Sequence, residues 1–215
     1  MSKKIGILGS GAVAKALGAG FLKHGYSVML GTTNPAKLAE WNTANPTAQL
    51  GSFEETAKFG DIIVLAVKGH AATVVLNTAG IANLAGKTVI DTCNPIDETR
   101  PPVNGVLNYF TSIDKSLIEV LQDAAPEANF VKAFSCIGSH LMVNPPFAEK
   151  ATMFICGNSD SAKKEVSEIL DLFGFEVEDS GKVEAGRAIE PLCMLWCIPG
   201  FTQNRWTHAF RLMKL

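Results

Sequence analysis

Near its start the chain has a glycine spacing that could bind phosphate. The apolar run 4–8 leads into Gly9-Ser10-Gly11-Ala12-Val13-Ala14, and an amphipathic pattern over 11–23 follows. Gly9 permits a tight turn after a strand, and Gly11 lets the backbone approach a pyrophosphate. The free N–H groups and the positive dipole end of the following helix would stabilise its charge. Because a strand, a helix and a second strand are all expected in order, we predict a dinucleotide site here rather than a structural turn.

The end of the second predicted strand bears on which dinucleotide binds. NAD sites usually carry Asp or Glu roughly 20 residues after the glycines, to bind the ribose hydroxyls. Here the segment is Gly31-Thr32-Thr33-Asn34, and the next acid is Glu40. A carboxylate would repel a 2′-phosphate, whereas hydroxyls, an amide and Lys37 would accept one, so NADP is favoured. The segment lacks arginine, the better bidentate partner of phosphate. Thr32 and Asn34 could instead simply cap the next helix.

Alternating strand and helix patterns would position these residues. Strands are expected at 4–8, 26–30, 48–51, 61–67, 87–91, 129–134, 152–156 and 175–179. Helices are expected at 11–23, 34–42, 52–58, 70–78, 116–125 and 159–173. The nearly continuous apolar run 61–67 is typical of a strand buried on both faces of a parallel sheet. We predict an α/β fold of the Rossmann type, with a doubly wound, mainly parallel sheet of about eight strands.

Two segments fall outside this alternation. Residues 96–112 follow Pro95, carry two adjacent prolines and are read as a long loop, of the kind that walls the ligand crevice at the carboxyl ends of strands. After the last strand we expect helices at 184–197 and 202–212, separated by a break at Pro199-Gly200. Arg205, Arg211 and Lys214 would then lie on a solvated helix face. The predicted domains are a nucleotide-binding domain over 1–181 and a C-terminal helical extension over 182–215.

The composition excludes several classes of partner. The chain has 215 residues, 47% of them hydrophobic, and a formal net charge of −2. It offers no electrostatic footprint for nucleic acid or an anionic membrane, and no apolar run approaches the roughly 20 residues that cross a bilayer. The basic start runs into an apolar stretch broken by glycines, which we read as structure and not as a targeting segment. The five cysteines form no Cys-x-x-Cys pair, which is typical of reduced thiols in the cytoplasm, and no metal site is expected.

Four further motifs make the chain similar to the NADPH-dependent F420 reductases, the family of NADP oxidoreductases dependent on coenzyme F420. The two most specific are Val131-Lys132-Ala133-Phe134-Ser135-Cys136-Ile137-Gly138, similar to the family's VKAFNTIG, and Glu190-Pro191-Leu192-Cys193-Met194-Leu195-Trp196, similar to its EPLAMLW. Ala66-Val67-Lys68-Gly69-His70-Ala71 resembles the family's segment beside the nicotinamide ribose, and Asp91-Thr92-Cys93-Asn94-Pro95 resembles its next strand-end motif. The resemblance implies NADP(H), hydride transfer with a deazaflavin bound in the crevice, and homodimers paired partly through the C-terminal helices.

The resemblance also assigns individual residues. It places Val67, Lys68, His70, Asn94 and Pro95 beside the cofactor, and Phe134, Ser135, Cys136 and Ile137 beside the second ligand. Ser135-Cys136 stands where the family has Asn-Thr, and Thr32-Thr33 stands where it usually has Ser-Arg. The acceptor therefore stays open between F420, a flavin, a ferric species and a small carbonyl compound.

Few side chains are expected to take part in the chemistry. Hydride transfer between two bound rings needs mainly positioning and exclusion of water, so no acid–base triad is required. His70 could donate a proton or contact the cofactor, or it could face solvent at a helix start. His140 could reach the second ligand from the loop after the sixth strand. We predict a structural role for Lys132, and nothing near Cys136 suggests a lowered thiol pKa.

Two other functions are compatible with the same patterns. A nucleotide-binding sensor or interaction module without turnover would need the same fold, because function lies in sites rather than folds. A dehydrogenase of a small carbonyl or imine substrate shares the N-terminal fold but normally adds a large helical domain with a catalytic lysine. Only residues 180–215 follow the last predicted strand. The leading hypothesis is an NADPH-dependent oxidoreductase with a small-molecule electron acceptor of the deazaflavin or flavin type.

Overall fold

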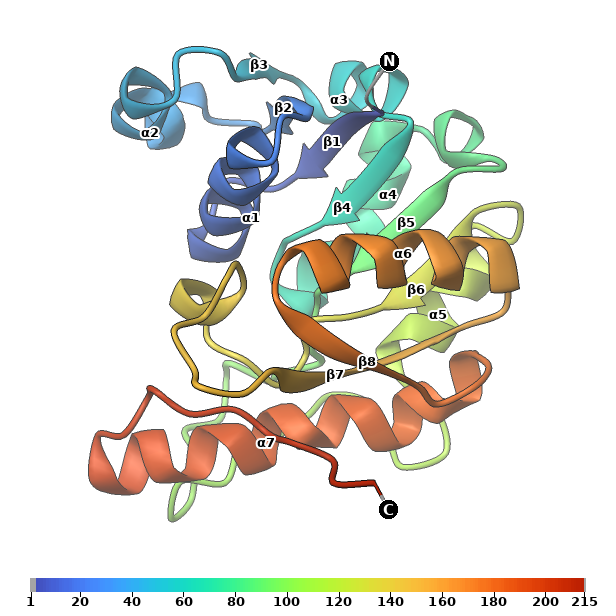
Figure 1. Cartoon of the computed structure of the whole chain (residues 1–215). Coiled ribbons are helices and arrows are strands. Elements are labelled where there is room, and N and C mark those ends of the chain that lie inside the picture. Colours follow the sequence, from blue (N-terminus) through green and yellow to red (C-terminus); the bar gives the residue numbers. More distant parts are fainter. Residues whose placement is uncertain (1–2, 215) are drawn as a thin grey trace.

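The computed structural model describes residues 3–214, so Met1, Ser2 and Leu215, at the outer limits of the two predicted domains, lie outside the described residues. One sheet has the strand order β3-β2-β1-β4-β5-β6-β7-β8 (Figure 1). Its strands are β1 (Lys4–Leu8), β2 (Ser27–Gly31), β3 (Gln49–Gly51), β4 (Ile62–Leu65), β5 (Thr88–Asp91), β6 (Asn129–Lys132), β7 (Ala151–Gly157) and β8 (Phe175–Asp179). Strands β1 to β6 are parallel, β7 is antiparallel to β6, and β8 is parallel to β7. The predicted doubly wound sheet is confirmed.

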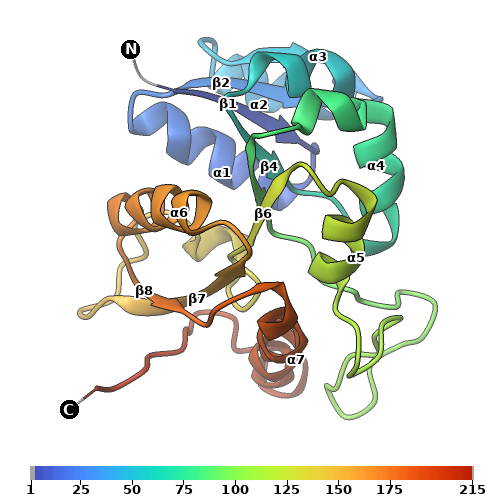
Figure 2. The same ribbon diagram turned by 90° about the vertical axis from the view of Figure 1, so that its right-hand side faces the viewer.

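Helices cover both faces of this sheet. They are α1 (Ala12–Lys23), α2 (Ala39–Ala44), α3 (Phe53–Phe59), α4 (Ala72–Ala79), α5 (Leu117–Ala124), α6 (Asp160–Leu172) and α7 (Gly186–Gln203). Short 3₁₀ turns are η1 (Pro35–Leu38), η2 (Gly69–Ala71), η3 (Ile81–Leu84), η4 (Ser139–Leu141) and η5 (Val183–Ala185). Helices α1 and α6 lie on one face and α3, α4 and α5 on the other (Figure 2). The single helix predicted at 34–42 is divided in the structure into the 3₁₀ turn η1 and the helix α2.

Strand β4 shows why the sequence makes a two-sided sheet. Ile62 and Val64 pack into the core beneath α1 and α6, whereas Ile63 and Leu65 pack into the core beneath α3, α4 and α5. All four side chains are buried, and each contributes roughly 1.5–3 kcal/mol of hydrophobic free energy. The prediction that this run is buried on both faces is confirmed.

Strand β6 ends earlier than predicted, at Lys132 rather than at 134. Phe134 has a φ of +61°, so the chain leaves the extended conformation there and turns into the loop toward η4. Its ring packs near the rings of Phe173 and Phe175, at centroid distances of 6.4 and 6.1 Å. The side chain of Phe134 thus belongs to the core.

The C-terminal region differs most from the sequence prediction. Helix α7 runs through Pro191 and Pro199 to Gln203, so the predicted break at Pro199-Gly200 is wrong, and so is the helix predicted at 202–212. Gly200 has no room for a side chain because Trp206 lies 2.2 Å from where its Cβ would be. The chain therefore turns back after α7 and folds over it, which the glycine permits.

The segment after α7 is extended and packs on β7. The Thr152 amide donates to the Phe210 carbonyl over 2.9 Å, and the Leu212 amide donates to the Thr152 hydroxyl over 2.9 Å. Arg211 pairs with Glu149, and Lys214 pairs with Glu178. These basic residues are exposed, as predicted, but they do not lie on a helix.

Candidate nucleotide site

The turn after β1 has the geometry of a phosphate cradle. Gly9 has a φ of +147°, and a Cβ there would lie 2.1 Å from the carbonyl oxygen of Ala66, so the position requires glycine. Helix α1 begins after Gly11 with no side chain capping it, which leaves backbone N–H groups free at its positive end. A Cβ on Gly11 would meet nothing within 4 Å. The backbone is therefore open on the side from which an anion could approach.

This turn borders a cleft of about 470 Å³ at the carboxyl ends of the parallel strands. Its lining brings together predicted residues from distant parts of the chain, namely Ser10, Gly11, Ala12, Val13, Lys37, Val67, Lys68 and His70, with Ala66, Ala71 and Thr92. A groove of about 550 Å³ lies at the amino ends of the strands, around Lys3, His24 and Tyr26. Doubly wound sheets bind ligands at the carboxyl ends, so the smaller cleft is the candidate site.

The end of β2 divides its polar residues into two roles. The buried Thr32 hydroxyl donates to the Ser10 hydroxyl over 3.2 Å and accepts from the Asn34 amide over 3.1 Å. Thr32 thus joins this end of the sheet to the phosphate cradle. Thr33, Asn34 and Lys37 are exposed, and Asn34 makes no side-chain cap on η1. An incoming phosphate would meet the exposed residues rather than Thr32.

The rim of the cleft carries an exposed charge cluster. Lys68 pairs with Glu98 over 2.8 Å, and His70 Nδ1 lies 3.8 Å from the same carboxylate. Glu98 belongs to the predicted long loop, which contacts the rim through this ion pair but contributes no residue to the cleft lining. Because all three side chains are exposed, each can still rearrange toward a bound ligand.

Two loops meet through Asn94 and Ser135, close in sequence to Thr92 of the cleft lining, although neither residue itself lines the cleft. The Asn94 side-chain amide donates to the Ser135 carbonyl over 3.0 Å. Asn94 Oδ1 and Ser135 Oγ are buried, and neither has a hydrogen-bond partner among residues 3–214. A buried polar atom without a partner costs about 1–3 kcal/mol, so these two atoms mark a place where a ligand could supply the missing bonds. Pro95, next to Asn94, is also buried.

The remaining residues predicted to contact the second ligand are placed differently. Cys136 and Ile137 are buried, and burial raises the pKa of the Cys136 thiol to about 12. Phe134 points into the core, so only its backbone is available to a ligand. His140 is exposed in η4 beside Gly138 and Trp196, and it does not line the cleft.

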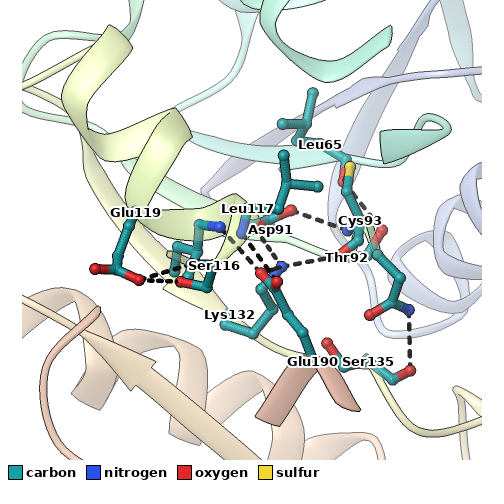
Figure 3. Close-up of polar contacts among 12 residues, drawn as sticks. Leu65, Asp91, Thr92, Cys93, Ser116, Leu117, Glu119, Lys132, Ser135 and Glu190 are labelled. Carbon is teal, nitrogen blue, oxygen red and sulfur yellow. Dashed lines mark hydrogen bonds and ion pairs between the residues drawn. The ribbon is translucent and has the colours of Figure 1, made fainter. Parts of the chain in front are cut away.

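Below the meeting point of the two loops lies a cluster of buried charges, drawn in Figure 3. Lys132 Nζ lies 2.6 Å from Asp91 and 2.9 Å from Glu190, and all three side chains are almost completely buried. Burial alone would lower the pKa of Lys132, but the two facing carboxylates outweigh it and raise that pKa above the ordinary lysine value. The sequence indicated a structural role for Lys132 but did not identify the residues that pair with it. A lysine inside an apolar strand was the available signal, because such a residue needs buried acids.

Residues 4–95 match the family described as NADP oxidoreductase, coenzyme F420-dependent. The chain is 29% identical to a crystallised protein from Arthrobacter sp. FB24 that was assigned to the F420-dependent NADP reductases. That likeness covers 99% of this chain and 100% of the other, with a TM-score of 0.93. A reductive aminase from Aspergillus terreus, crystallised with NADPH, is 16% identical over 95% of this chain and 64% of its own, with a TM-score of 0.69; it shows the shared fold alone.

The curated relatives are metalloreductases that are longer than this chain. The chain is 31% identical to the metalloreductase STEAP3 of Rattus norvegicus over 91% of its own residues and 38% of the relative. It is 25% identical to the human metalloreductase STEAP2 over 87% of its residues and 35% of that protein. This chain thus spans less than half the length of these relatives. Among the helices of residues 3–214, none combines the length and apolarity needed to cross a bilayer.

Proposed function

We propose that this chain, whose residues 4–95 match the coenzyme F420-dependent NADP oxidoreductases, transfers a hydride between NADP(H) and a deazaflavin or flavin. The observation that carries this proposal is the cleft at the carboxyl ends of the strands. One end of the cleft is an uncapped helix start with an open Gly11, and the segment that follows β2 has no acid before Glu40. This combination suits a pyrophosphate and a 2′-phosphate together.

Each part of the cleft has a role in this proposal. The N–H groups at the start of α1 bind the pyrophosphate, while Thr33, Asn34 and Lys37 receive the 2′-phosphate. Bound NADPH supplies the hydride from its nicotinamide ring. Asn94 and Ser135 orient that ring by giving its carboxamide the hydrogen bonds that Asn94 Oδ1 and Ser135 Oγ lack in the chain itself. No side chain needs to move a proton for the hydride step.

The acceptor class rests on the family and on the crystallised relative. Both are described by coenzyme F420, and a planar deazaflavin or flavin could stack beside the nicotinamide near Ser135. The curated relatives are metalloreductases, which makes ferric reduction by way of a bound flavin a second candidate. The cleft would supply the same half-reaction, oxidation of NADPH, in either case.

A titration followed by an acceptor screen tests the proposal. NADPH fluorescence should change on binding to the protein, and added F420, FMN, FAD or FAD with ferric citrate should then drive NADPH oxidation. We expect F420 or a free flavin to give the fastest turnover. An absence of NADPH binding would refute the proposal. Binding without oxidation by any of these acceptors would favour the sensor without turnover.

We further propose that the protein acts as a homodimer in the cytoplasm. Large apolar side chains are exposed along α7 and the neighbouring loop, including Leu195 at 53% and Phe201 at 49%. The loop contributes Val103, Val106, Phe110 and Ile113 to the same kind of surface. Such clusters are typical of surfaces that pair. Light scattering should give twice the chain mass, and Leu195→Glu should give a monomer; a monomeric parent protein would contradict the pairing.

A further inference from the structure

The buried charge cluster of Asp91, Lys132 and Glu190 contacts the backbone of Cys93, the residue before Asn94 (Figure 3). We infer that Lys132 is a positioning residue that fixes the nicotinamide end of the cleft. This inference rests on the proposed function and adds to it the device that sets the geometry of Asn94 and Ser135.

The Lys132 ammonium faces three oxygens. Its Nζ forms ion pairs with Asp91 Oδ2 at 2.6 Å and Glu190 Oε1 at 2.9 Å, and it donates a hydrogen bond to the carbonyl oxygen of Cys93 over 2.7 Å. The other oxygen of Asp91 accepts from the Cys93 amide over 2.9 Å. The cluster therefore holds both backbone polar groups of Cys93, the residue directly before Asn94.

The same lysine lies at the end of β6, three positions before Ser135. Its hydrogen bond to Cys93 therefore joins the loop that follows β5 to the end of β6, where the loop that carries Ser135 begins. Farther out, the two loops meet again where Asn94 donates to the Ser135 carbonyl. Two points of attachment leave the loops little freedom to slide past one another. The two unpartnered atoms, Asn94 Oδ1 and Ser135 Oγ, take their positions from this frame.

The charges of the cluster are balanced by a helix. Two carboxylates face one ammonium, which leaves a formal excess of one negative charge in the interior. Glu190 also accepts from the amides of Leu117 and Ile118, at 2.9 and 3.0 Å, which are the first N–H groups of α5. The positive end of that helix offsets the excess. Helix α7 is thereby connected, through Glu190 and Lys132, to the backbone of Cys93.

Stability alone does not account for such a cluster. Apolar side chains of similar volume would serve as well or better in the interior, because burying charges carries a large desolvation cost. Polar contacts differ from apolar packing because they are directional, so each one fixes the position of a particular atom. The atoms fixed here are the backbone atoms before Asn94.

A second buried acid between the same helices provides a matched control. Arg187 on α7 bonds Glu119 on α5 through two contacts, at 2.9 and 2.5 Å, and Glu119 accepts from Ser116. This pair ties α5 to α7 as Glu190 does, but it makes no contact with residues 91–95. Arg187→Ala therefore weakens the same helix contact without touching the loop that carries Asn94.

The test compares Lys132→Met, Asp91→Asn and Arg187→Ala in the full chain. NADPH fluorescence titration gives Kd, and the time-resolved fluorescence anisotropy of bound NADPH reports motion of the nicotinamide ring on the nanosecond timescale. Lys132→Met should raise the Kd for NADPH by no more than about tenfold, because the phosphate cradle is intact, yet add a fast anisotropy decay. Arg187→Ala should lower the melting temperature without adding that decay.

Asp91→Asn guards against a variant that does not fold. It leaves Lys132 and Glu190 as a neutral pair and turns one of the two Asp91 oxygens into a donor, so either the bond from the Cys93 amide or the contact with Lys132 is lost, and it should show the same fast decay. If both site variants bind NADPH with the ring as immobile as in the parent protein, the inference is wrong while the proposed function stands. If the parent protein does not bind NADPH, both fail. Equal mobility of the nicotinamide ring in Lys132→Met and Arg187→Ala would mean that the cluster only stabilises the fold and does not position the ring.

Discussion

Asn94 donates its side-chain amide to the backbone carbonyl of Ser135 across 3.0 Å, which joins the loop after β5 to the loop after β6. This bond uses the amide nitrogen of the Asn94 side chain and the backbone carbonyl of Ser135. The carbonyl oxygen of the Asn94 side chain and the hydroxyl of Ser135 stay buried and without a partner among the described residues. Paired, these two atoms would favour a ligand with both a donor and an acceptor, such as a carboxamide.

Ser135→Ala should separate cofactor binding from stability. Removing a buried hydroxyl without a partner should leave the free energy of unfolding unchanged or raise it by up to about 1 kcal/mol. If the hydroxyl bonds the nicotinamide, the Kd for NADPH should rise about three- to tenfold. Urea unfolding and fluorescence titration measure the two quantities. Ser161→Ala, an exposed serine on α6, should change neither; an unchanged NADPH affinity in Ser135→Ala would remove Ser135 from the site.

Gly9 and Gly11 lie two residues apart and should respond differently to alanine. Gly9→Ala forces a strained φ and a Cβ 2.1 Å from a backbone oxygen, so it should cost about 2–4 kcal/mol of unfolding free energy. Gly11→Ala places its methyl in open space and should cost about 1 kcal/mol or less through the weaker helix cap. It should nevertheless raise the Kd for NADPH about tenfold or more, because the methyl occupies the approach of the pyrophosphate.

Gly86→Ala is the control for backbone strain alone. Gly86 also has a positive φ, of +72°, but a Cβ there would meet nothing within 4 Å, and the residue is remote from the cleft. We expect a loss of about 1 kcal/mol and no change in NADPH affinity. Tight NADPH binding by Gly11→Ala would contradict the placement of the phosphates.

Lys37 should control the choice between the two dinucleotides. It is exposed, lines the cleft and is the one lysine that follows β2 before Glu40. Lys37→Ala should weaken NADPH binding about tenfold, or roughly 1.4 kcal/mol, and leave NADH binding nearly unchanged. Lys37→Glu should weaken NADPH further through repulsion of the 2′-phosphate. Lys23→Ala, at the far end of α1, serves as the control; an equal loss for both cofactors would place Lys37 away from the 2′-phosphate.

Local patterns were sufficient to predict the nucleotide-binding half of the fold. The alternation of Ile62, Ile63, Val64 and Leu65 between two cores follows from a continuous apolar run, and the helix predicted at 52–58 matches α3 at Phe53–Phe59 to within one residue. Both features depend on residues that are neighbours in the chain. The position of the phosphate cradle depends on neighbours as well, which is why it could be assigned before any tertiary contact was known.

Features set by distant contacts could not be predicted in this way. Pro199-Gly200 has the composition of a helix end, yet α7 continues through both residues to Gln203, and Trp206 folds back onto Gly200. The inward turn of Phe134 depends on its neighbours Phe173 and Phe175. The sequence marks Lys132 as unusual but does not identify Glu190 as its partner, because the two meet only when α7 packs beneath the sheet.

The Arg187–Glu119 pair should make stability depend on pH in the acid range. The hydrogen bond from Arg187 is the largest cause that lowers the pKa of Glu119 to about 2; burial opposes it and Ser116 adds to it. The ordinary value is 4.5, so the folded chain binds this proton less readily than the unfolded chain does. The pair therefore stabilises the fold fully above about pH 4.5, and its contribution is lost as the pH falls toward about 2.

Arg187→Ala should accordingly matter most at neutral pH. We expect its urea midpoint to lie below that of the parent protein at about pH 7, with the same difference at about pH 5 and about half of it near pH 3. The remaining bonds from Ser116 keep part of the pKa shift, so the acid dependence should shrink without disappearing. Lys150→Ala is the comparison, because Lys150 and Asp171 form an exposed ion pair of small effect. A midpoint difference that stays constant down to about pH 3 would mean that Arg187 contributes through packing rather than through the charge of Glu119.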